Sequence, residues 1–303
     1  MNIVSATNIF KSYEAVKALN DVSFEVKECE LFGFIGPDGA GKTSLFRILT
    51  TLLLPDSGKA SICGLDIVAD YKAIRNILGY MPGRFSLYQD LSVEENLTFF
   101  ATVFGTTIKE NYDLIKDIYS HIEPFKSRQA GKLSGGMKQK LALSCALIHK
   151  PKVLILDEPT TGVDAVSRKE FWQMLKNLQQ KGITILVSTP YMDEASLCDR
   201  VALIQQGIIM SIETPENITD RFNKTILAIR SEKMFNLITD LRNYPETNSV
   251  FIFGQYVHFT SRENPPKKEN IYNYLTSKGH SQIEIIESKP TVEDCFMDLM
   301  VNN

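Results

Sequence analysis

The sequence predicts an α/β fold built around a mainly parallel β-sheet, and three segments support this prediction. Each contains a mostly apolar run typical of a buried strand, at residues 31–35, 153–156 and 183–188. A glycine-rich turn and a helix follow the first run, and a helix joins the second run to the third. Strands joined by helices through short links form parallel sheets with right-handed crossovers. Such sheets bind ligands at the carboxyl ends of their strands.

The turn after the first run has the pattern of a phosphate-binding loop. The residues of this loop and of the helix start are Gly36, Pro37, Asp38, Gly39, Ala40, Gly41, Lys42, Thr43 and Ser44. Glycines let the backbone approach a polyphosphate closely, and the loop N–H groups and helix N-terminus attract its charge. Lys42 would reach the β and γ oxygens and Thr43 would bind Mg²⁺. The alternative, a glycine-rich turn with a chance Lys-Thr pair, is disfavoured by the flanking strand and helix.

The length and composition indicate a globular protein with a larger and a smaller domain. The chain has 303 residues, of which 44% are hydrophobic and 23% charged, and a formal net charge of -3 gives no electrostatic footprint for nucleic acid. Five cysteines, odd in number and widely spaced, indicate thiols in a reducing compartment. No apolar window is long enough for a membrane span and the start lacks a signal peptide. We therefore expect a cytoplasmic protein that reaches a membrane only by docking onto other proteins.

The N-terminal residues predict an antiparallel sheet beside the loop strand. Short β-rich runs at residues 8–10 and 22–26 alternate with turns, and residues 59–64 form a returning strand after a Pro-Asp-Ser-Gly turn. Tyr13 follows the first run. Its ring could stack on a purine or lie half-buried in the sheet, and these residues alone favour the sheet.

Residues from about 85 to 146 predict a helical insert, since their apolar residues recur at spacings of three to four. The insert leads to the segment Leu133-Ser134-Gly135-Gly136-Met137. Ser134 is a good N-cap, so this segment would present a second helix N-terminus to an anion. An ordinary capped helix explains the segment equally well when it is considered alone.

Two carboxylates end the second apolar run. Asp157 and Glu158 would lie at the carboxyl edge of the sheet, beside the loop. Asp157 can hold the hydration shell of Mg²⁺, and Glu158 can orient or deprotonate an attacking water.

The last part of the chain predicts a separate small domain. From about residue 224 the strand and helix signals follow the order β-α-β-β-α-β, with a short helix after them and no nucleotide motif. We expect one domain over residues 1–222 and an accessory domain over 223–303.

These motifs together resemble the ATP-binding subunit of an ABC transporter, over about residues 1 to 215. The segment from Leu133 to Gly136 resembles the signature of this family, with Met137 in place of the common Gln, and residues 161–164 fall where the family has its D-loop. The resemblance implies a P-loop NTPase of the ABC ATPase type, with an antiparallel β subdomain, a helical subdomain and here a small α+β C-terminal domain. Tyr13 falls where the family stacks adenine. The resemblance therefore favours stacking on a purine over a half-buried place in the sheet.

Residues 79–82, 87–97 and 290–294 resemble the ABC-2-type multidrug exporter branch of this family. This resemblance implies ATP and Mg²⁺ as cofactors and ABC-2-type membrane permease subunits as partners, with the protein held at the inner face of the cell membrane. The permease would dock near residues 83–90, with Phe85 and Tyr88 as anchors. Family dimers are head-to-tail, so Ser134, Gly135 and Gly136 would complete the ATP site of the other subunit.

Two positions depart from the family pattern. Gly83 stands where the family has a Gln that contacts Mg²⁺ and water, and Pro190 stands where it has a His that contacts the γ-phosphate. Neither side chain can donate, accept or ligate. We therefore expect slow hydrolysis at this chain's own site and a heterodimer with a second ATPase subunit, although a homodimer stays open. The alternatives are a non-catalytic ATP-binding regulatory subunit and a soluble ABC ATPase of translation or DNA repair, which usually carries a second cassette or a coiled-coil insert.

Overall fold

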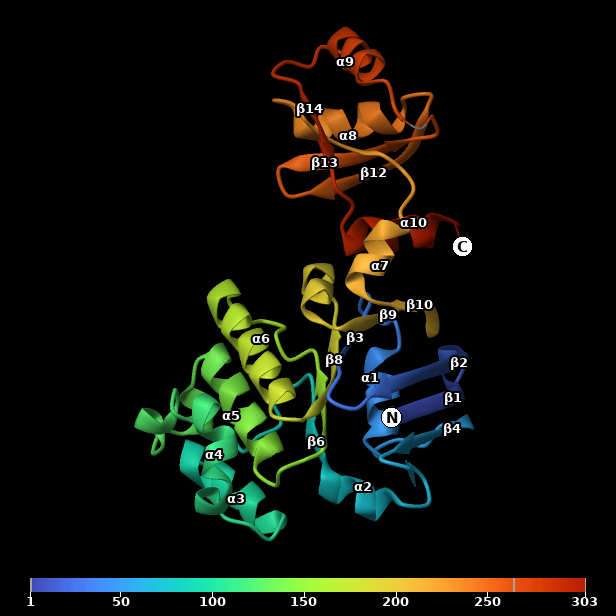
Figure 1. Cartoon of the computed structure of the whole chain (residues 1–303). Helices are drawn as coiled ribbons and strands as arrows, with labels where there is room; N and C mark the ends of the chain where they lie inside the picture. Colours follow the sequence, from blue (N-terminus) through green and yellow to red (C-terminus); the bar gives the residue numbers. More distant parts are fainter. Residues whose placement is uncertain (1, 264, 303) are drawn as a thin grey trace. The chain divides into compact units, whose positions relative to one another are not determined.

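A computed structural model describes residues 2–263 and 265–302 of the chain. The chain divides into two compact units, Met1–Pro215 with two β-sheets and Glu216–Asn303 with one (Figure 1). The expected boundary after residue 222 falls inside the second unit, just after α7 (Pro215–Asp220). Whether residues 1–222 fold independently stays a prediction. None of the described helices is long and apolar enough to span a bilayer.

A six-stranded sheet forms the centre of the first unit. Its strand order is β10-β9-β3-β8-β7-β6, and all neighbours are parallel except β9 and β10. The strands are β3 (Leu31–Ile35), β6 (Leu78–Met81), β7 (Val153–Asp157), β8 (Thr184–Thr189), β9 (Arg200–Gln205) and β10 (Ile208–Glu213). Every residue of β3, β7 and β8 is buried, which explains why these strands read as continuous apolar runs. The predicted parallel sheet is confirmed.

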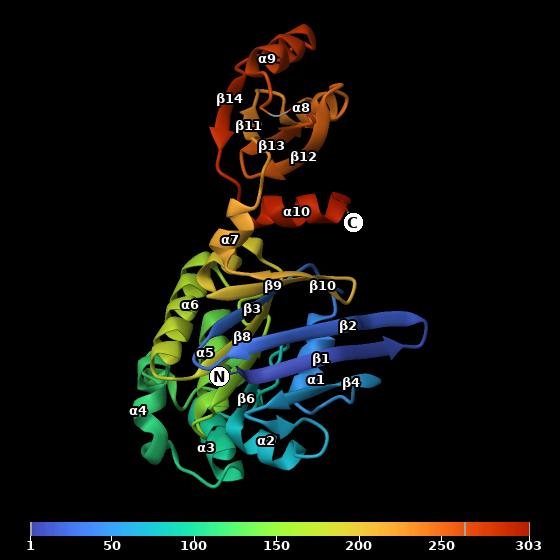
Figure 2. The same cartoon turned by 45° about the vertical axis from the view of Figure 1, so that its right-hand side comes forward.

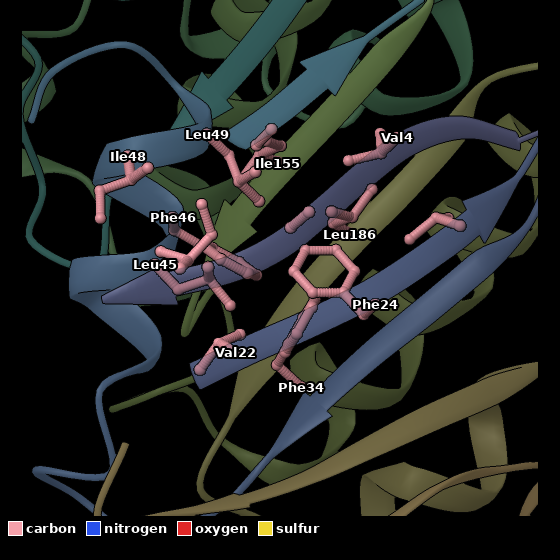
Figure 3. Packing of buried hydrophobic residues seen from close by; sticks show 14 of the residues in the cluster. Val4, Val22, Phe24, Phe34, Leu45, Phe46, Ile48, Leu49, Ile155 and Leu186 are labelled. Carbon is pink, nitrogen blue, oxygen red and sulfur yellow. The ribbon is translucent and has the colours of Figure 1, made fainter. Parts of the chain in front are cut away.

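A second, antiparallel sheet in this unit has the order β2-β1-β4-β5. Its strands are β1 (Asn2–Tyr13), β2 (Val16–Lys27), β4 (Ser57–Ile62) and β5 (Leu65–Asp66). The core between the sheets encloses α1 (Lys42–Leu49): Phe34 of β3 meets Phe24 edge-on at 4.9 Å between ring centroids and Phe46 of α1 at 5.4 Å (Figure 3). Because both ends of the phosphate-binding loop are anchored in this core, the loop has a fixed place.

The remaining helices of the first unit flank the central sheet. They are α2 (Tyr71–Ile77), α3 (Val93–Val103), α4 (Ile108–Tyr119), α5 (Gly135–Leu147) and α6 (Ala165–Gln180), with 3-10 turns at Glu123–Phe125, Ala130–Lys132 and Met192–Leu197. Ser92 and Glu95 form a capping box at the start of α3, and Thr107 and Glu110 form another at the start of α4. Helices α3, α4 and α5 therefore occupy the segment where the apolar spacing predicts helices.

The second unit has a four-stranded antiparallel sheet of order β12-β13-β11-β14 (Figure 2). Its elements are β11 (Ile226–Arg230), α8 (Met234–Arg242), β12 (Thr247–Phe253), β13 (Tyr256–Ser261), α9 (Lys268–Ser277), β14 (Glu284–Ser288) and α10 (Val292–Asn302). Leu227 and Phe259 of the sheet form one core with Leu237 of α8 and Ile271 of α9. The predicted β-α-β-β-α-β order and the helix after it are both present.

Candidate functional site

The phosphate-binding loop connects the end of β3 to the start of α1. Gly36 donates its N–H to the Thr189 carbonyl at 3.3 Å, which ties the loop to the end of β8. Gly41 adopts the left-handed conformation, with φ of 101°, immediately before α1. A Cβ atom there would lie 2.3 Å from the Ala18 carbonyl oxygen. The loop thus forms the tight glycine cradle at a helix N-terminus that the sequence predicts.

Lys42 is buried, with 3% exposure, and its Nζ atom points back over the loop. It donates to the carbonyl oxygens of Gly36 at 2.7 Å and Pro37 at 3.0 Å. Its third neighbour is Glu158 Oε1, at 3.3 Å. The ammonium group is therefore held where a polyphosphate lying in the cradle would meet it.

Tyr13 lies beside the start of α1. It ends β1 with 43% of its surface exposed, and the Ser44 hydroxyl donates to the Tyr13 hydroxyl at 3.4 Å. The structure thus brings an exposed aromatic ring to the same helix turn that carries Lys42 and Thr43.

Asp157 and Glu158 follow one another at the carboxyl end of β7. Asp157 has 2% exposure and accepts a hydrogen bond from the Ser188 hydroxyl at 2.6 Å. The Glu158 N–H donates to the Ser188 carbonyl and hydroxyl oxygens, both at 3.0 Å, and its φ of 48° turns the chain toward the loop. The Thr161 hydroxyl donates to Glu158 Oε2 at 3.4 Å. Ser188, which the sequence analysis did not single out, therefore holds the Asp157 carboxylate and the backbone of Glu158.

These groups fit a nucleotide-bound Mg²⁺ better than a metal held by protein alone. Among residues 2–263 and 265–302 there is no group of three or more His, Cys, Asp or Glu side chains that could hold a metal. Mg²⁺ in nucleotide sites takes most ligands from phosphate and water, with one or two protein groups. The Thr43 hydroxyl and the Asp157 carboxylate would supply such a set.

The structure places Gly83 against Asp157. A Cβ atom on Gly83 would lie 3.2 Å from the Asp157 carbonyl oxygen and 3.7 Å from Asp157 Oδ2. Pro190 follows Thr189, the residue that bonds the loop. Both departures from the family pattern thus lie at the carboxyl edge of the sheet. A polar side chain at either position would lie near Asp157 or the phosphate-binding loop.

Tyr80 is a further neighbour of Asp157 that sequence reasoning missed. Burial, followed by the nearby Asp157 carboxylate, raises the pKa of Tyr80 to about 12. Tyr80 therefore stays neutral at physiological pH. It lies on the short edge strand β6, inside the stretch 79–82 that the sequence analysis used only as a family resemblance.

Helix α5 begins at the signature segment. Ser134 is its N-cap and accepts a hydrogen bond from the Met137 N–H at 3.4 Å, while Ser134 and Gly135 are exposed. A Cβ atom on Gly135 would lie 3.5 Å from the Gly162 carbonyl oxygen, so the D-loop segment lies beside the signature. Figure 1 shows α5 and α1 on either side of the part of the sheet that includes β6 and β8. The structure therefore does not bring Ser134, Gly135 and Gly136 to the phosphate-binding loop of their own chain.

A cavity of about 550 Å³ lies next to the segment that carries Gly83. Its lining includes Arg47, Tyr80, Ser86, Leu87, Phe100 and His149. The expected anchors lie nearby but outside this lining: Phe85 is half-buried, and Tyr88 is half-exposed with its ring 5.0 Å from that of Phe99.

His149 gives this cavity a polar wall. Its Nε2 atom lies 3.1 Å from the Leu78 carbonyl oxygen, and burial lowers the pKa of His149, so the ring is neutral near pH 7 and Nε2 donates this bond. The buried Nδ1 atom is then an acceptor, and it has no hydrogen-bond partner among the residues described.

The fold and this set of groups define a P-loop ATPase of the ATP-binding-cassette class. A family model described as ABC transporter matches residues 19–161. Over 300 residues the chain is 30% identical to the Nod factor export ATP-binding protein I of Rhizobium sp. (strain N33), covering 98% of this chain and 96% of that protein. The chain belongs to the ABC transporter family, among its ATP-binding proteins.

Further similarities extend this result. The chain is 40% identical over 273 residues to the probable multidrug ABC transporter ATP-binding protein YbhF of Escherichia coli (strain K12), covering 88% of this chain. It spans about half of that relative, 46% of its length. Among solved structures, cbiO1 from Clostridium perfringens, part of the ABC transporter complex cbiONQ, covers 73% of this chain and 91% of its own at 26% identity and a TM-score of 0.65. The dimeric ATP-binding cassette MJ0796 bound to ADP and Pi covers 70% of this chain and 98% of its own, at 25% identity and a TM-score of 0.63.

Proposed function

We propose that this chain is the ATP-binding motor subunit of an ABC-2-type exporter and powers efflux through separate permease subunits at the inner face of the cell membrane. The observation that carries the proposal is the glycine cradle with Lys42 held across it and two carboxylates beside it. Relatives named for multidrug transport and Nod factor export support the exporter role.

Each group of the site has a role in this proposal. The loop N–H groups and Lys42 bind the phosphates, and Tyr13 stacks on adenine. Thr43 and Asp157 hold Mg²⁺, which neutralises charge on the phosphates. Glu158 orients the attacking water and takes its proton. In the structure this carboxylate also pairs with Lys42, so Lys42 connects the catalytic base to the phosphate cradle.

A complete site requires two subunits in this proposal. Ser134, Gly135 and Gly136 begin a helix on the other side of the sheet from their own loop, and they are the groups that would reach the γ-phosphate bound to a partner. The dimeric cassette with ADP and Pi among the similar structures supports such an assembly.

Gly83 and Pro190 make this chain's own site a slow one in the proposal. Loss of one preorganised transition-state donor typically lowers a rate by roughly 10²- to 10³-fold. The partner would then be a different ATPase subunit with both groups in place. The same two residues favour the second candidate function, a non-catalytic ATP-binding regulatory subunit.

The first test restores the missing groups. Gly83→Gln with Pro190→His should raise the basal ATPase rate of the full chain at least several-fold, because a side chain at position 83 starts 3.7 Å from Asp157 Oδ2. Steady-state phosphate release measures the rate. Adding Glu158→Gln to the restored chain is the control and should abolish the gain. A restored chain that dimerises with ATP but hydrolyses it no faster would show that other groups limit the reaction.

The second test asks whether only the partner's ATP site turns over in the complex of this chain with its partner ATPase. Gly135→Asp should nearly abolish ATPase activity of the complex, because a charged side chain would repel the γ-phosphate bound to the partner. The fold should tolerate it, since a Cβ atom there meets only the Gly162 carbonyl oxygen, at 3.5 Å. Glu158→Gln, which affects only the slow site, should leave most activity in place. Equal losses from both substitutions would argue for two obligately coupled sites or for a homodimer.

The cavity beside Gly83 is the proposed docking site of the permease. Its mostly apolar lining suits a short permease helix. Because Tyr80 lies both in this lining and near Asp157, docking and nucleotide binding share a side chain.

A further inference from the structure

Glu194 is a buried carboxylate that none of the roles above uses. It lies in the 3-10 turn Met192–Leu197 with 2% exposure. The Thr160 hydroxyl donates to its Oε1 atom at 2.8 Å, and the Thr189 hydroxyl donates to its Oε2 atom. The single side chain therefore joins the segment after β7 to the end of β8. A buried carboxylate with this many fixed donors has a defined position.

Arg168 of α6 completes the surroundings of Glu194. Its Nε atom is buried, lies 3.8 Å from Glu194 Oε1 and has no hydrogen-bond partner among the described residues. Its Cζ atom lies 4.2 Å from the centroid of the Tyr191 ring, within cation–π range. Asp193 lies at the outer side, with Oδ2 3.7 Å from Nη1, and is largely exposed. Arg168 thus contacts Tyr191, Asp193 and Glu194, which follow Pro190 in the chain.

The same network reaches the nucleotide loop at one end. The Thr189 carbonyl accepts the Gly36 N–H at 3.3 Å, while the Thr189 hydroxyl binds Glu194. The Tyr191 N–H donates to the Thr189 hydroxyl at 3.1 Å. A displacement of the loop would therefore shift Thr189 directly, and Thr189 would in turn shift Glu194.

At its other end the network reaches the signature. Helix α6 begins at its N-cap Asp164, in the D-loop segment, and Arg168 donates its N–H to the Asp164 carbonyl at 2.9 Å. Ser167, which precedes Arg168, lies close to Gly136. A Cβ atom on Gly136 would lie 2.8 Å from Ser167 Oγ. The residues Gly36, Thr189, Glu194, Arg168 and Ser167 thus form a continuous chain of contacts from the phosphate loop to the start of α5.

We infer that Glu194 and Arg168 are positioning residues that transmit nucleotide occupancy at this chain's own site to its D-loop and signature. The inference rests on the proposed function, since it assigns a role to ATP held at a slow site. A subunit that retains its nucleotide could in this way set the position of Ser134, Gly135 and Gly136 for the partner's reaction. Neither residue belongs to the phosphate cradle described above, so we expect the pair to affect the coupling between the sites more than the contacts of the cradle itself.

The test measures hydrogen exchange of the full-length chain with and without MgATP. In the parent, MgATP should slow exchange in peptides covering the phosphate loop, residues 36–46, and in peptides covering residues 160–172. In Arg168→Met and in Glu194→Gln the loop should stay protected, while protection of residues 160–172 should fall by roughly 2- to 30-fold, the range of single-residue effects on coupling. Lys176→Met, which breaks the α6 ion pair to Asp199 at 2.9 Å, is the matched control and should leave both regions protected.

The two kinds of failure give different results. A parent chain whose loop gains no protection from MgATP would overturn the proposed function itself. A protected loop together with undiminished protection of residues 160–172 in both variants would overturn the inference alone. Glu194→Gln keeps an acceptor for Thr160 and Arg168→Met changes a partly exposed side chain, so at least one variant should fold. If the two act as one pair, the double variant should lose no more protection than the larger single loss.

Discussion

Two glycines of the phosphate-binding loop are required for different physical reasons. Gly36 lacks space, because a Cβ atom there would lie 2.0 Å from the Ile204 carbonyl oxygen of β9. Gly39 has open space around it but adopts φ of 79°, a conformation that disfavours L side chains. Packing of the sheet therefore limits the first position, and backbone geometry limits the second.

This difference predicts unequal stability losses. Gly36→Ala should lower the free energy of unfolding by about 3 kcal/mol or more, because backbone atoms of two strands must move apart. Gly39→Ala should lower it by roughly 1–2 kcal/mol, the cost of a left-handed residue. Urea unfolding of the full chain, followed through the transition of the first unit, measures both.

Gly105→Ala is the control for these variants. It shares a positive φ of 67° and open space but lies between α3 and α4, away from the loop. Its stability loss should match that of Gly39→Ala without any change in ATP affinity. Equal losses at positions 36 and 39 would show that the contact with Ile204 does not limit the fold.

At the scale of elements, residues of β6, α3 and α5 together line the cavity beside Gly83. Helix α3 presents Phe100 to the cavity, whereas Val103, less than one turn further, is 61% exposed outside its lining. One helix therefore offers two apolar residues of which only one faces the proposed docking site.

Phe100→Glu should weaken recovery of permease subunits with this chain, because a carboxylate in the apolar lining must be desolvated on docking. Co-purification from solubilised membranes measures recovery, and MgATP affinity should remain that of the parent. Val103→Glu adds the same charge to the same helix and should leave recovery intact. If Val103→Glu disrupts the complex while Phe100→Glu does not, the permease docks elsewhere.

At the scale of the whole molecule, the groups of the candidate nucleotide site all belong to the first compact unit. The second unit has its own sheet and core and includes most of α7. Within it, Ile218 of α7 is 6% exposed and its carbonyl accepts a hydrogen bond from the Cys295 thiol of α10 at 3.5 Å. Helix α7 is thus part of the packing of the second unit.

Truncation tests this division. Fragments ending at residue 215 and at residue 222 should both bind MgATP, because every phosphate and adenine group lies before residue 190. The longer fragment should be more prone to aggregation, since it exposes Ile218 without α10. Calorimetric titration measures binding, light scattering measures aggregation, and Lys42→Ala in the shorter fragment is the control for specific binding. A folded fragment of either length that fails to bind ATP would contradict the assignment of the site to the first unit.

Local patterns in the sequence determined the fold class, the nucleotide loop, the Asp157-Glu158 pair and the element order of the second unit. Each of these depends on residues adjacent in the chain or spaced by one strand or helix period, so the chain carries the signal locally. Tertiary structure alone decided that Glu194 meets Thr160 and Arg168, that Ser188 holds Asp157, and that Tyr80 lies both in the cavity lining and near Asp157. These contacts join single polar residues from separate strands and helices. No spacing marks them, because only the packing of the elements sets which side chains meet.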